Sequence, residues 1–417
     1  MPKVLFPDYM LTFRCIGNEC EDSCCKNLEI PVNRDTYLKY KRLEDREFSE
    51  RLVQGMEVLE ASKRRSDQYA VIKLDEATGH CTFLENGLCS IQMKLGESCL
   101  SKVCASYPRR SNQVDDTFET SALLSCPEAA RLALLNPEGM SFTYVEAEQP
   151  ITIGARMTTK LPSGIPYAKY FWDIRTFAVE MLQNRSYSLS HRVMQLAVLA
   201  VALDESCAKG KVDQIPHIIQ RFRDQLDGGG EIAKTETFPT DLHFQFKFLN
   251  ALLLLLISAK VSNNDKYMEC LDQYIDGIQK AGDGFSEQEL VRYYGECRRN
   301  YYDPFMAEHE YIFENYLVNQ LFSSAFPYDT ELKLFTKVFY MGVIYGLLRM
   351  QLIGMAACHE RLTADMIIQL IYSFIRNFEH NQNFKKVLLE QCEAGNIRTL
   401  GHLSLLVMES DAMEDSR

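Results

Sequence analysis

The stretch LFTKVFYMGVIYGLLRMQLIGMAA, residues 334–357, gives the clearest structural signal in the chain. Apolar side chains recur in it at intervals of four and three residues, at Leu334, Val338, Met341, Tyr345, Leu348 and Leu352. This spacing puts them on one face of an α-helix, so the stretch predicts a buried helix. Similar patterns predict helices near residues 168–183, 189–206, 242–260, 304–325 and 362–378. The carboxyl-terminal part of the chain is therefore predicted to be all-helical.

The first third of the chain has a different, mixed pattern. Residues 33–65 predict one long or two short exposed helices capped by Asn33, and residues 69–75 predict a strand. Residues 85–87, Glu-Asn-Gly, predict a hairpin turn with Cys81 and Cys89 on its two arms. A short helix is expected at 97–106, and another is expected to begin at Cys126-Pro127.

These patterns predict a mainly α protein in two domains. A small mixed α+β domain that carries a cysteine cluster is expected at residues 1–135, and a larger all-helical domain at 167–417. The segment between them, 136–166, is rich in proline and glycine and is expected to be a linker or crossover.

Composition narrows the function classes. The 417 residues are 46% hydrophobic and 24% charged, which is typical of a soluble globular protein. The net charge of −12 disfavours nucleic acid as a partner and favours a cationic one. Residues 1–10 do not resemble a secretory signal, so a cytoplasmic location is expected. The apolar runs 248–259 and 338–348 are too short to cross a bilayer, and we expect buried helices there.

Nine of the 14 cysteines lie before residue 127, and this cluster suggests a metal site. In a reducing cytosol such a cluster is more consistent with metal ligation than with disulfides. The spacing leaves zinc and an iron–sulfur cluster both open, and nine thiols exceed the four that one such site takes from protein. A purely structural metal and a chemically active cluster also both remain open. The candidate ligands are Cys15, Cys20, Cys24, Cys25, Cys81, Cys89, Cys99, Cys104 and Cys126.

Some of these cysteines need separate treatment. Cys24 and Cys25 are adjacent, so their side chains are not expected to bind the same zinc ion. Cys126 at a helix start is either a thiol of lowered pKa, suited to ligation, or a small capping residue in the core. The five later cysteines lie in apolar helical stretches and are expected to be core residues.

A second candidate site is an aromatic segment near residues 293–316. Aromatic rings and carboxylates can hold a cation such as a lysine head group or a sulfonium, although helical aromatics are also common in cores. No glycine-rich dinucleotide fingerprint or phosphate-binding loop is present. The candidate cofactor-binding residues are Tyr293, Tyr294, Tyr301, Tyr302 and Glu314.

Several motifs together resemble one family. These are YMLTFRCIGNECEDSCC at 9–25, CTFL at 81–84, LCSI at 88–91, CASYP at 104–108 and ENY at 314–316. They resemble the flagellin lysine N-methylases of motile bacteria, and the cysteine core also resembles zinc- or iron-chelating cysteine-cluster proteins. The first resemblance implies a cytoplasmic enzyme that transfers a methyl group from S-adenosylmethionine to lysines of flagellin. It also implies a 4Fe-4S cluster on the amino-terminal cysteines, with zinc as the alternative metal.

One departure from a better-known pattern bears on mechanism. The first cysteines are separated by four, three and no residues, unlike the Cys-x3-Cys-x2-Cys triplet of radical S-adenosylmethionine enzymes. Transfer to a neutral lysine amine, assisted by a desolvated channel, is compatible with the residues. The alternative, from another class, is a non-enzymatic zinc- or iron-binding protein whose helical domain docks a partner protein. The sequence identifies no catalytic residue.

Overall fold

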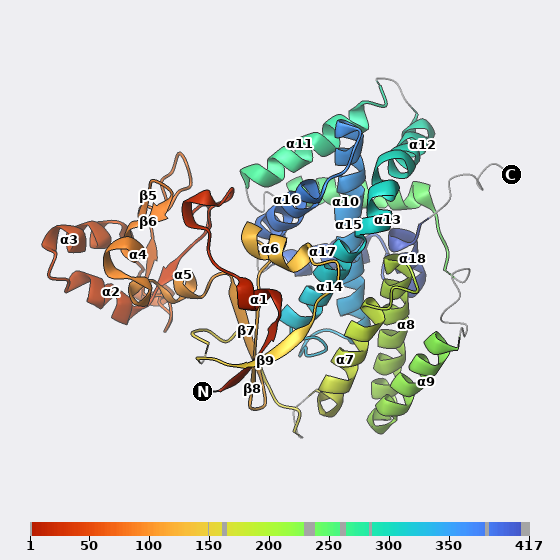
Figure 1. Cartoon of the computed structure of the whole chain (residues 1–417), viewed down its shortest axis with the longest axis horizontal. Coiled ribbons are helices and arrows are strands. Elements are labelled where there is room, and N and C mark those ends of the chain that lie inside the picture. Colours follow the sequence, from red (N-terminus) through yellow and green to blue (C-terminus); the bar gives the residue numbers. More distant parts are fainter. Residues whose placement is uncertain are drawn as a thin grey trace.

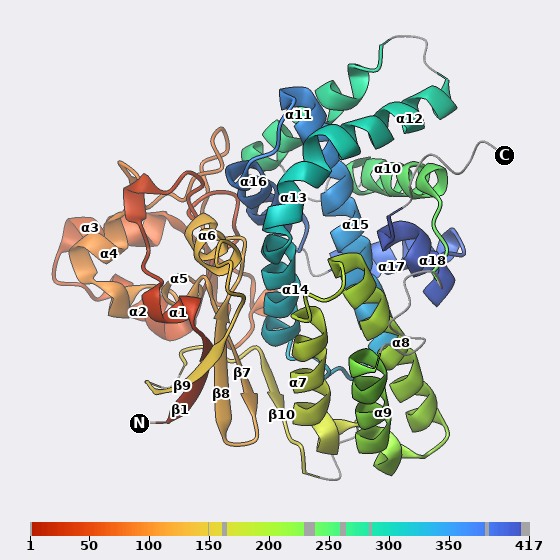
Figure 2. The same cartoon turned by 45° about the vertical axis from the view of Figure 1, so that its right-hand side comes forward.

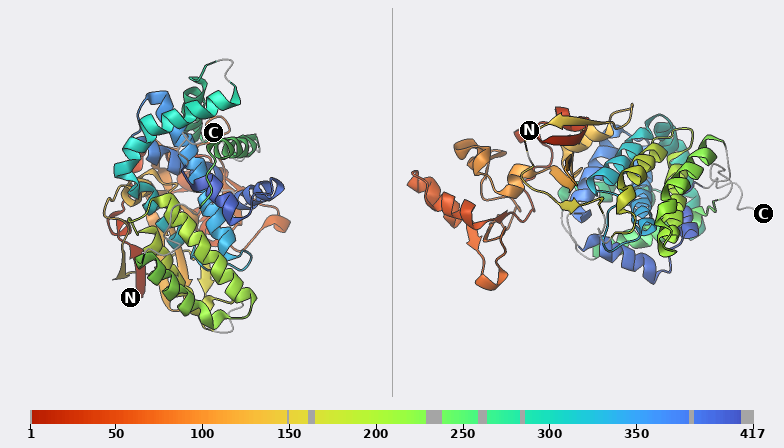
Figure 3. Two further views of the ribbon diagram at one scale, coloured as in Figure 1. Left: turned by 90° about the vertical axis from the view of Figure 1, so that its right-hand side faces the viewer. Right: turned by 90° about the horizontal axis from the view of Figure 1, so that it is seen from below.

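The computed structural model places a small amino-terminal lobe and a mixed sheet beside a large helical body. It describes residues 2–148, 150–160, 165–228, 238–258, 264–282, 286–379 and 383–409. In Figure 1 the lobe lies at one end, the sheet in the middle and the helical body at the other end. The view from below in Figure 3 shows the lobe extending away from the helices. The predicted fold class, mainly α with a small mixed amino-terminal part, is confirmed.

The lobe contains short elements whose local signals are readable in the sequence. Asn33 caps the first of two separate helices by accepting a hydrogen bond from the Thr36 amide. The predicted hairpin is present, with Leu84 paired to Cys89. The predicted helix 97–106 is interrupted, because the Ser101 hydroxyl caps a new helix by accepting from the Cys104 amide. The lobe's elements are β2 (Pro31–Val32), α2 (Arg34–Lys41), α3 (Arg46–Gln54), β3 (Met56–Val58), β4 (Ala70–Ile72), β5 (Leu84–Glu85), β6 (Leu88–Cys89), α4 (Ser90–Leu95) and α5 (Lys102–Ser106).

The five-stranded sheet combines one strand from the start of the chain with four strands from residues 109–157. Its order is β10-β7-β8-β1-β9, with β1 parallel to β8 and antiparallel to β9. Figure 2 shows these strands lying beside α14 and α7. The segment 136–166, predicted as a linker, thus contributes two strands to this sheet. The strands are β1 (Lys3–Pro7), β7 (Arg109–Val114), β8 (Thr117–Ala122), β9 (Phe142–Glu146) and β10 (Ala155–Met157).

Two further helices accompany the sheet. Short helix α1 (Tyr9–Thr12) follows β1, and α6 (Pro127–Leu134) begins at Cys126 with proline in its first turn, as predicted. Residues of α6, including Ala130 and Leu134, pack in the same core as the helical body. The packing core therefore crosses from the predicted first domain into the second, and the predicted division at 135 and 166 stays a prediction.

The helical body is built around α15, the helix predicted from the opening stretch. Among the described residues α15 alone is long and apolar enough to cross a membrane by length and composition, but 89% of its most apolar window is buried in the protein. The helices are α7 (Phe171–Leu182), α8 (Leu189–Ala208), α9 (Ile215–Asp227), α10 (Leu242–Ser258), α11 (Asp265–Gln279), α12 (Glu287–Cys297), α13 (Asp303–His309), α14 (Tyr311–Ser323), α15 (Leu334–His359), α16 (Ala364–Phe374), α17 (Phe384–Ala394) and α18 (Leu400–Val407), with π-helical turns η8 (Arg298–Tyr302) and η9 (Ile375–Glu379).

The second apolar run is only half buried. Leu252, Leu253 and Leu256 of α10 lie in the core, whereas Leu254 and Leu255 are exposed. The prediction of a buried helix at 248–259 is correct for one face of α10 and wrong for the other. Five consecutive leucines, residues 252–256, cover too much of the helix circumference for all of them to face one core.

Helices α11 and α15 approach closely at two glycines, and this contact gives a testable prediction. A Cβ atom on Gly277 would lie 1.8 Å from the Gly354 carbonyl oxygen. We expect Gly277→Ala to lower the free energy of unfolding by about 1–3 kcal/mol, because the backbones must separate. Gly401→Ala is the control, since its Cβ would meet nothing closer than 3.9 Å. Equal denaturant midpoints for the two variants would contradict this packing.

Candidate functional site

The fold closes the long sequence gap between the first and second groups of cysteines. The Cys81 amide donates a hydrogen bond to the Cys25 carbonyl at 2.8 Å. Lys26 also pairs with His80 in an isolated antiparallel bridge. The segment that carries Cys24 and Cys25 therefore runs directly against the hairpin arm that begins at Cys81.

Six thiols gather in this region of the lobe. Cys81 is buried in the lobe core, and Cys25, Cys89, Cys99 and Cys104 pack around it. Burial, together with the neighbouring Cys104, Cys89 and Cys24, raises the pKa of the Cys81 thiol to about 11. Burial likewise raises the pKa of Cys104 to about 11. The pKa of Cys24 is raised chiefly by its hydrogen bond with Cys25.

A second group of thiols adjoins the first through Cys24. Burial raises the pKa of Cys126 to about 12, and Cys20 and Cys24 also raise it. Of the two alternatives left open for Cys126, a thiol of lowered pKa is the one that is contradicted, because desolvation outweighs the hydrogen bonds from the first turn of α6. Burial raises the pKa of Cys20 to about 11 as well. Cys15 is exposed between α1 and the following turn.

This thiol set fits a cation by its chemistry. Ionising these thiols costs free energy in two ways, because the thiolates are desolvated and because they repel one another. A bound cation would offset both costs. Within the part of the chain that the structure describes, no three potential ligands stand close enough together to hold one metal ion. The structure thus brings the thiols into one region but does not arrange the described ones as the ligands of a metal site. Metal binding stays a prediction.

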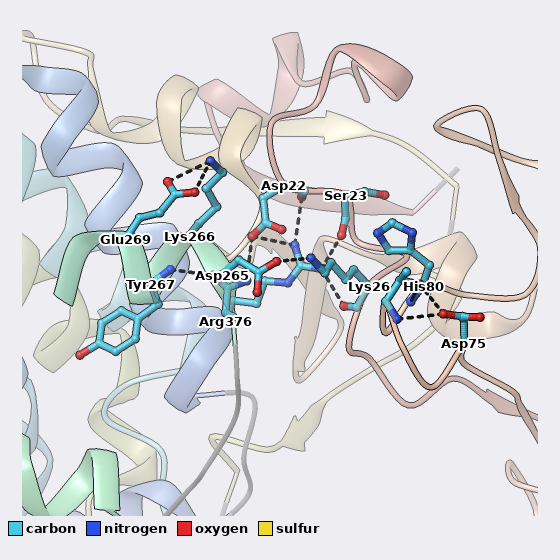
Figure 4. Close-up of polar contacts among 12 residues, drawn as sticks. Asp22, Ser23, Lys26, Asp75, His80, Asp265, Lys266, Tyr267, Glu269 and Arg376 are labelled. Atoms are coloured by element: carbon cyan, nitrogen blue, oxygen red, sulfur yellow. Dashed lines mark hydrogen bonds and ion pairs between the residues drawn. The ribbon is translucent and has the colours of Figure 1, made fainter. Parts of the chain in front are cut away.

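Arg376 of η9 anchors the cysteine segment to the helical body (Figure 4). Its guanidinium donates to the carbonyl oxygens of Asp22 at 3.0 Å, of Ser23 and of Lys26 at 2.9 Å. It also lies 3.1 Å from the Asp22 carboxylate, and both side chains are at most 8% exposed. One side chain thus fixes the backbone on both sides of Cys24 and Cys25.

Helix α11 holds the same segment from another direction. The Asn264 amide group donates to the Asp22 carboxylate at 3.0 Å, while its side-chain oxygen caps α11 by accepting from the Tyr267 amide. Lys26 forms an ion pair with Asp265, which Figure 4 shows beside Arg376. The cysteine segment is therefore positioned by two elements of the helical body.

The predicted aromatic site lies inside the helical body. Tyr294 and Tyr302 are buried in the core, and Tyr293 and Tyr301 are partly buried against it. The Tyr293 hydroxyl donates to the Gly277 carbonyl at 3.2 Å. These positions accord with the alternative of core aromatics, and the cofactor-binding role stays a prediction.

Glu314, the carboxylate of that predicted site, is engaged by two arginines. It is 1% exposed, and its oxygens accept from Arg185 at 2.9 Å and from Arg192 at 2.6 Å. Arg192 is fully buried and also pairs with Glu310. This carboxylate balances one buried and one half-exposed arginine and does not face an open cation site.

Two adjoining cavities were not predicted from the sequence. Their volumes are about 290 Å³ and about 240 Å³, and they share Arg110, Gln320, Ser324 and Glu379. These residues come from β7, from α14 and its C-cap, and from η9, and they form no local motif. Sequence reasoning had no signal for them, because only the packed fold brings them together.

The fold and site define a class of protein: a mainly helical protein with a cysteine-rich lobe that is predicted to bind metal. Arg376 fixes this lobe to a helical body that contains a charged cavity. The family model described as the FliB lysine N-methylase C-terminal domain matches residues 175–406, more than half of the chain. The chain belongs to this FliB lysine N-methylase family. The match begins in α7 and ends in α18, so it spans the helical body.

Full-length relatives agree with this assignment. Proteins named Lysine-N-methylase from Salmonella choleraesuis and Salmonella typhimurium are each 23% identical over 412 residues, which is 96% of this chain and 97% of theirs. The Flagellar biosynthetic protein FliU of Salmonella muenchen is 32% identical over 136 residues, 32% of this chain and 79% of that protein. No solved structure matches. The predicted resemblance to lysine N-methylases is confirmed, whereas the resemblance of the cysteine core to zinc- or iron-chelating proteins stays a prediction.

Proposed function

We propose that this chain is a protein-lysine N-methyltransferase that transfers a methyl group from S-adenosylmethionine to lysine side chains of flagellin in the cytoplasm. The observation that carries the proposal is the similarity of 96% of the chain to proteins named Lysine-N-methylase. The name of the FliU relative supports a flagellar acceptor. The net charge of −12 favours a lysine-bearing partner.

The reaction requires a neutral amine. The lysine nitrogen attacks the methyl carbon, the carbon–sulfur bond breaks, S-adenosylhomocysteine leaves and the amine loses a proton. A free lysine, with a pKa near 10.4, would have to lose its proton first at a cost of about 4–5 kcal/mol at pH 7. Desolvation and the nearby sulfonium lower that pKa, and in-line positioning supplies further acceleration.

We further propose that the thiols of the lobe hold an iron–sulfur cluster. Cys24, Cys81, Cys89 and Cys104 are the central candidates, because their pKa shifts link them to one another. When bound, a cluster supplies positive charge and a covalent link between the lobe's segments. The chain's own contribution is the positioning of those thiols through Arg376 and the backbone pairing of Cys25 with Cys81.

Anaerobic purification followed by a methylation assay tests both proposals. We expect brown protein with visible absorbance, and label transfer from methyl-labelled S-adenosylmethionine to flagellin lysines. Folded, metal-replete protein that transfers no label would overturn the enzyme proposal, and would favour a non-enzymatic protein that docks a partner. Colourless protein with stoichiometric zinc would overturn the iron–sulfur proposal.

Single cysteine variants test the ligand assignment. Cys24→Ser and Cys89→Ser are expected to lose most of the bound metal and to unfold at lower denaturant concentration. Cys207→Ser, in α8 of the helical body, is the matched control and should retain the metal. Unchanged metal content in both lobe variants would remove these residues from the ligand set.

A further inference from the structure

Two opposite charges line the same pair of cavities without forming an ion pair. The Arg110 guanidinium makes no hydrogen bond and no ion pair within 4.0 Å among the described residues, and Arg110 and Glu379 line both cavities. Among the described residues, Glu379 accepts long hydrogen bonds from neutral groups alone, at 3.4 Å from the Tyr316 hydroxyl and at 3.3 Å from the Gln320 amide. The space between them is therefore bounded by a cation and a carboxylate.

This arrangement is costly in the free protein. Burial raises the pKa of Glu379 to about 7, although the amide, the hydroxyl and Arg110 lower it. The Arg110 side chain is accessible to solvent at the cavity, yet burial still lowers its pKa. Partly desolvated charges without close partners are destabilising, so a ligand that pairs with both would recover that cost.

The other cations of the cavity wall already have partners. Lys337 donates to the Tyr328 carbonyl at 2.6 Å and lies 3.7 Å from the Asp329 carboxylate. Lys385 lies 3.8 Å from the same carboxylate. Of the cavity-lining cations in the described part of the chain, Arg110 thus remains free to receive an anionic group.

The cavity lies next to the cysteine region. Glu379 ends the same π-helical turn from which Arg376 reaches Asp22 and Ser23. Leu123 and Leu124, which also line the larger cavity, come just before Cys126 in the sequence. Cys126 and the arginine that holds the cysteine segment therefore each lie within three residues of the cavity lining.

We propose that these joined cavities bind the α-amino carboxylate group of an amino acid, namely the methionyl end of S-adenosylmethionine. Arg110 pairs with the carboxylate and Glu379 with the ammonium group. A lysine side chain would satisfy Glu379 alone, whereas a zwitterion satisfies both residues. The choice of S-adenosylmethionine among amino acids rests on the proposed function. Gln320 and Ser324 offer further polar groups, and Tyr340 and Phe384 offer ring surface for the remainder of the ligand.

Binding measurements on the full-length, metal-replete protein test the site. Arg110→Met and Glu379→Gln are each expected to weaken the affinity for S-adenosylmethionine ten- to one-hundredfold, because each removes one charge-assisted contact. Arg109→Met is the matched control, because Arg109 is the neighbouring residue of β7 and lines a different cavity. This variant should bind S-adenosylmethionine with wild-type affinity. Wild-type affinity in both folded site variants would overturn the proposal.

Ligand variants identify which part of the molecule is recognised. S-adenosylhomocysteine keeps the amino carboxylate and should show the same sensitivity to both substitutions. 5′-Methylthioadenosine lacks it and should bind weakly, with equal affinity to wild type and variants. An equal loss of 5′-methylthioadenosine binding in the variants would overturn the assignment of the charged pair to the amino-acid end.

A thermal unfolding measurement separates binding from folding. Replacing Glu379 by glutamine removes a carboxylate that is costly to ionise, so the free variant should melt at a higher temperature than wild type at pH 8 while it binds less ligand. A lower melting temperature with an unchanged affinity would mark Glu379 as structural and overturn its role.

The outcomes also separate this proposal from the proposed function. Wild type that binds S-adenosylmethionine through Arg110 and Glu379 but methylates no lysine would retain the site and overturn the activity. Binding of methionine without S-adenosylmethionine would retain an amino-acid site and overturn the cofactor. Binding of neither would overturn the site itself.

Discussion

Arg376→Ala is expected to lower the free energy of unfolding by about 3–5 kcal/mol and to release the cysteine segment from the helical body. The substitution leaves the Asp22 carboxylate buried without its cation and removes the donor to three carbonyl oxygens. Breaking a buried pair in this way has costs of that size. Denaturant unfolding measures the global effect, and hydrogen exchange at residues 20–26 measures the local one.

Two further variants make the Arg376 prediction specific. Arg376→Lys keeps the charge but cannot donate to three separated carbonyls from a planar group, so less than half of the loss should be recovered. Arg398→Ala removes an exposed ion pair with Glu393 and should change stability by less than about 1 kcal/mol. Wild-type stability and exchange protection in Arg376→Ala would show that the segment is held by other contacts.

Elements with local signals were predictable from the sequence. Asn33 followed by Thr36 gives a capped helix, Cys126-Pro127 gives a helix start, and the apolar spacing of 334–357 gives the central helix. Each of these depends on residues within a few positions of one another. By contrast, β9 pairs with β1, as in Lys3 with Glu146, and no local pattern announces such a distant partner.

The same distinction applies to the candidate site. The gathering of the cysteines was predictable, because short spacings and one hairpin already bring several thiols together. The anchor at Arg376 and the placement of Arg110 and Glu379 on the same two cavities were not. These residues are far from their neighbours in sequence and meet them only in the packed fold, and a single arginine or glutamate is ordinarily a surface residue.

Glu314→Gln is the second substitution with a large expected effect. We expect it to lower the free energy of unfolding by about 3–5 kcal/mol, because the fully buried Arg192 loses the carboxylate 2.6 Å away. Arg185, which is 46% exposed, loses less because water can replace its partner. Denaturant unfolding of the full-length protein measures the loss.

The result also decides between two roles for the aromatic segment. If Glu314 serves only to balance arginines, the folded fraction of Glu314→Gln should bind S-adenosylmethionine with wild-type affinity. A loss of affinity at unchanged stability would instead establish the sulfonium site first predicted from Tyr293, Tyr294 and Glu314.

Glu310→Gln provides a graded control on the same network. Glu310 also pairs with Arg192, but its side chain is 36% exposed, so its replacement should cost clearly less than that of Glu314. Because Arg192 contacts both carboxylates, the double variant should lose a different amount from the sum of the single losses. If the two losses simply add, the two carboxylates act independently. Glu314 would then stabilise the protein through contacts other than the one with Arg192.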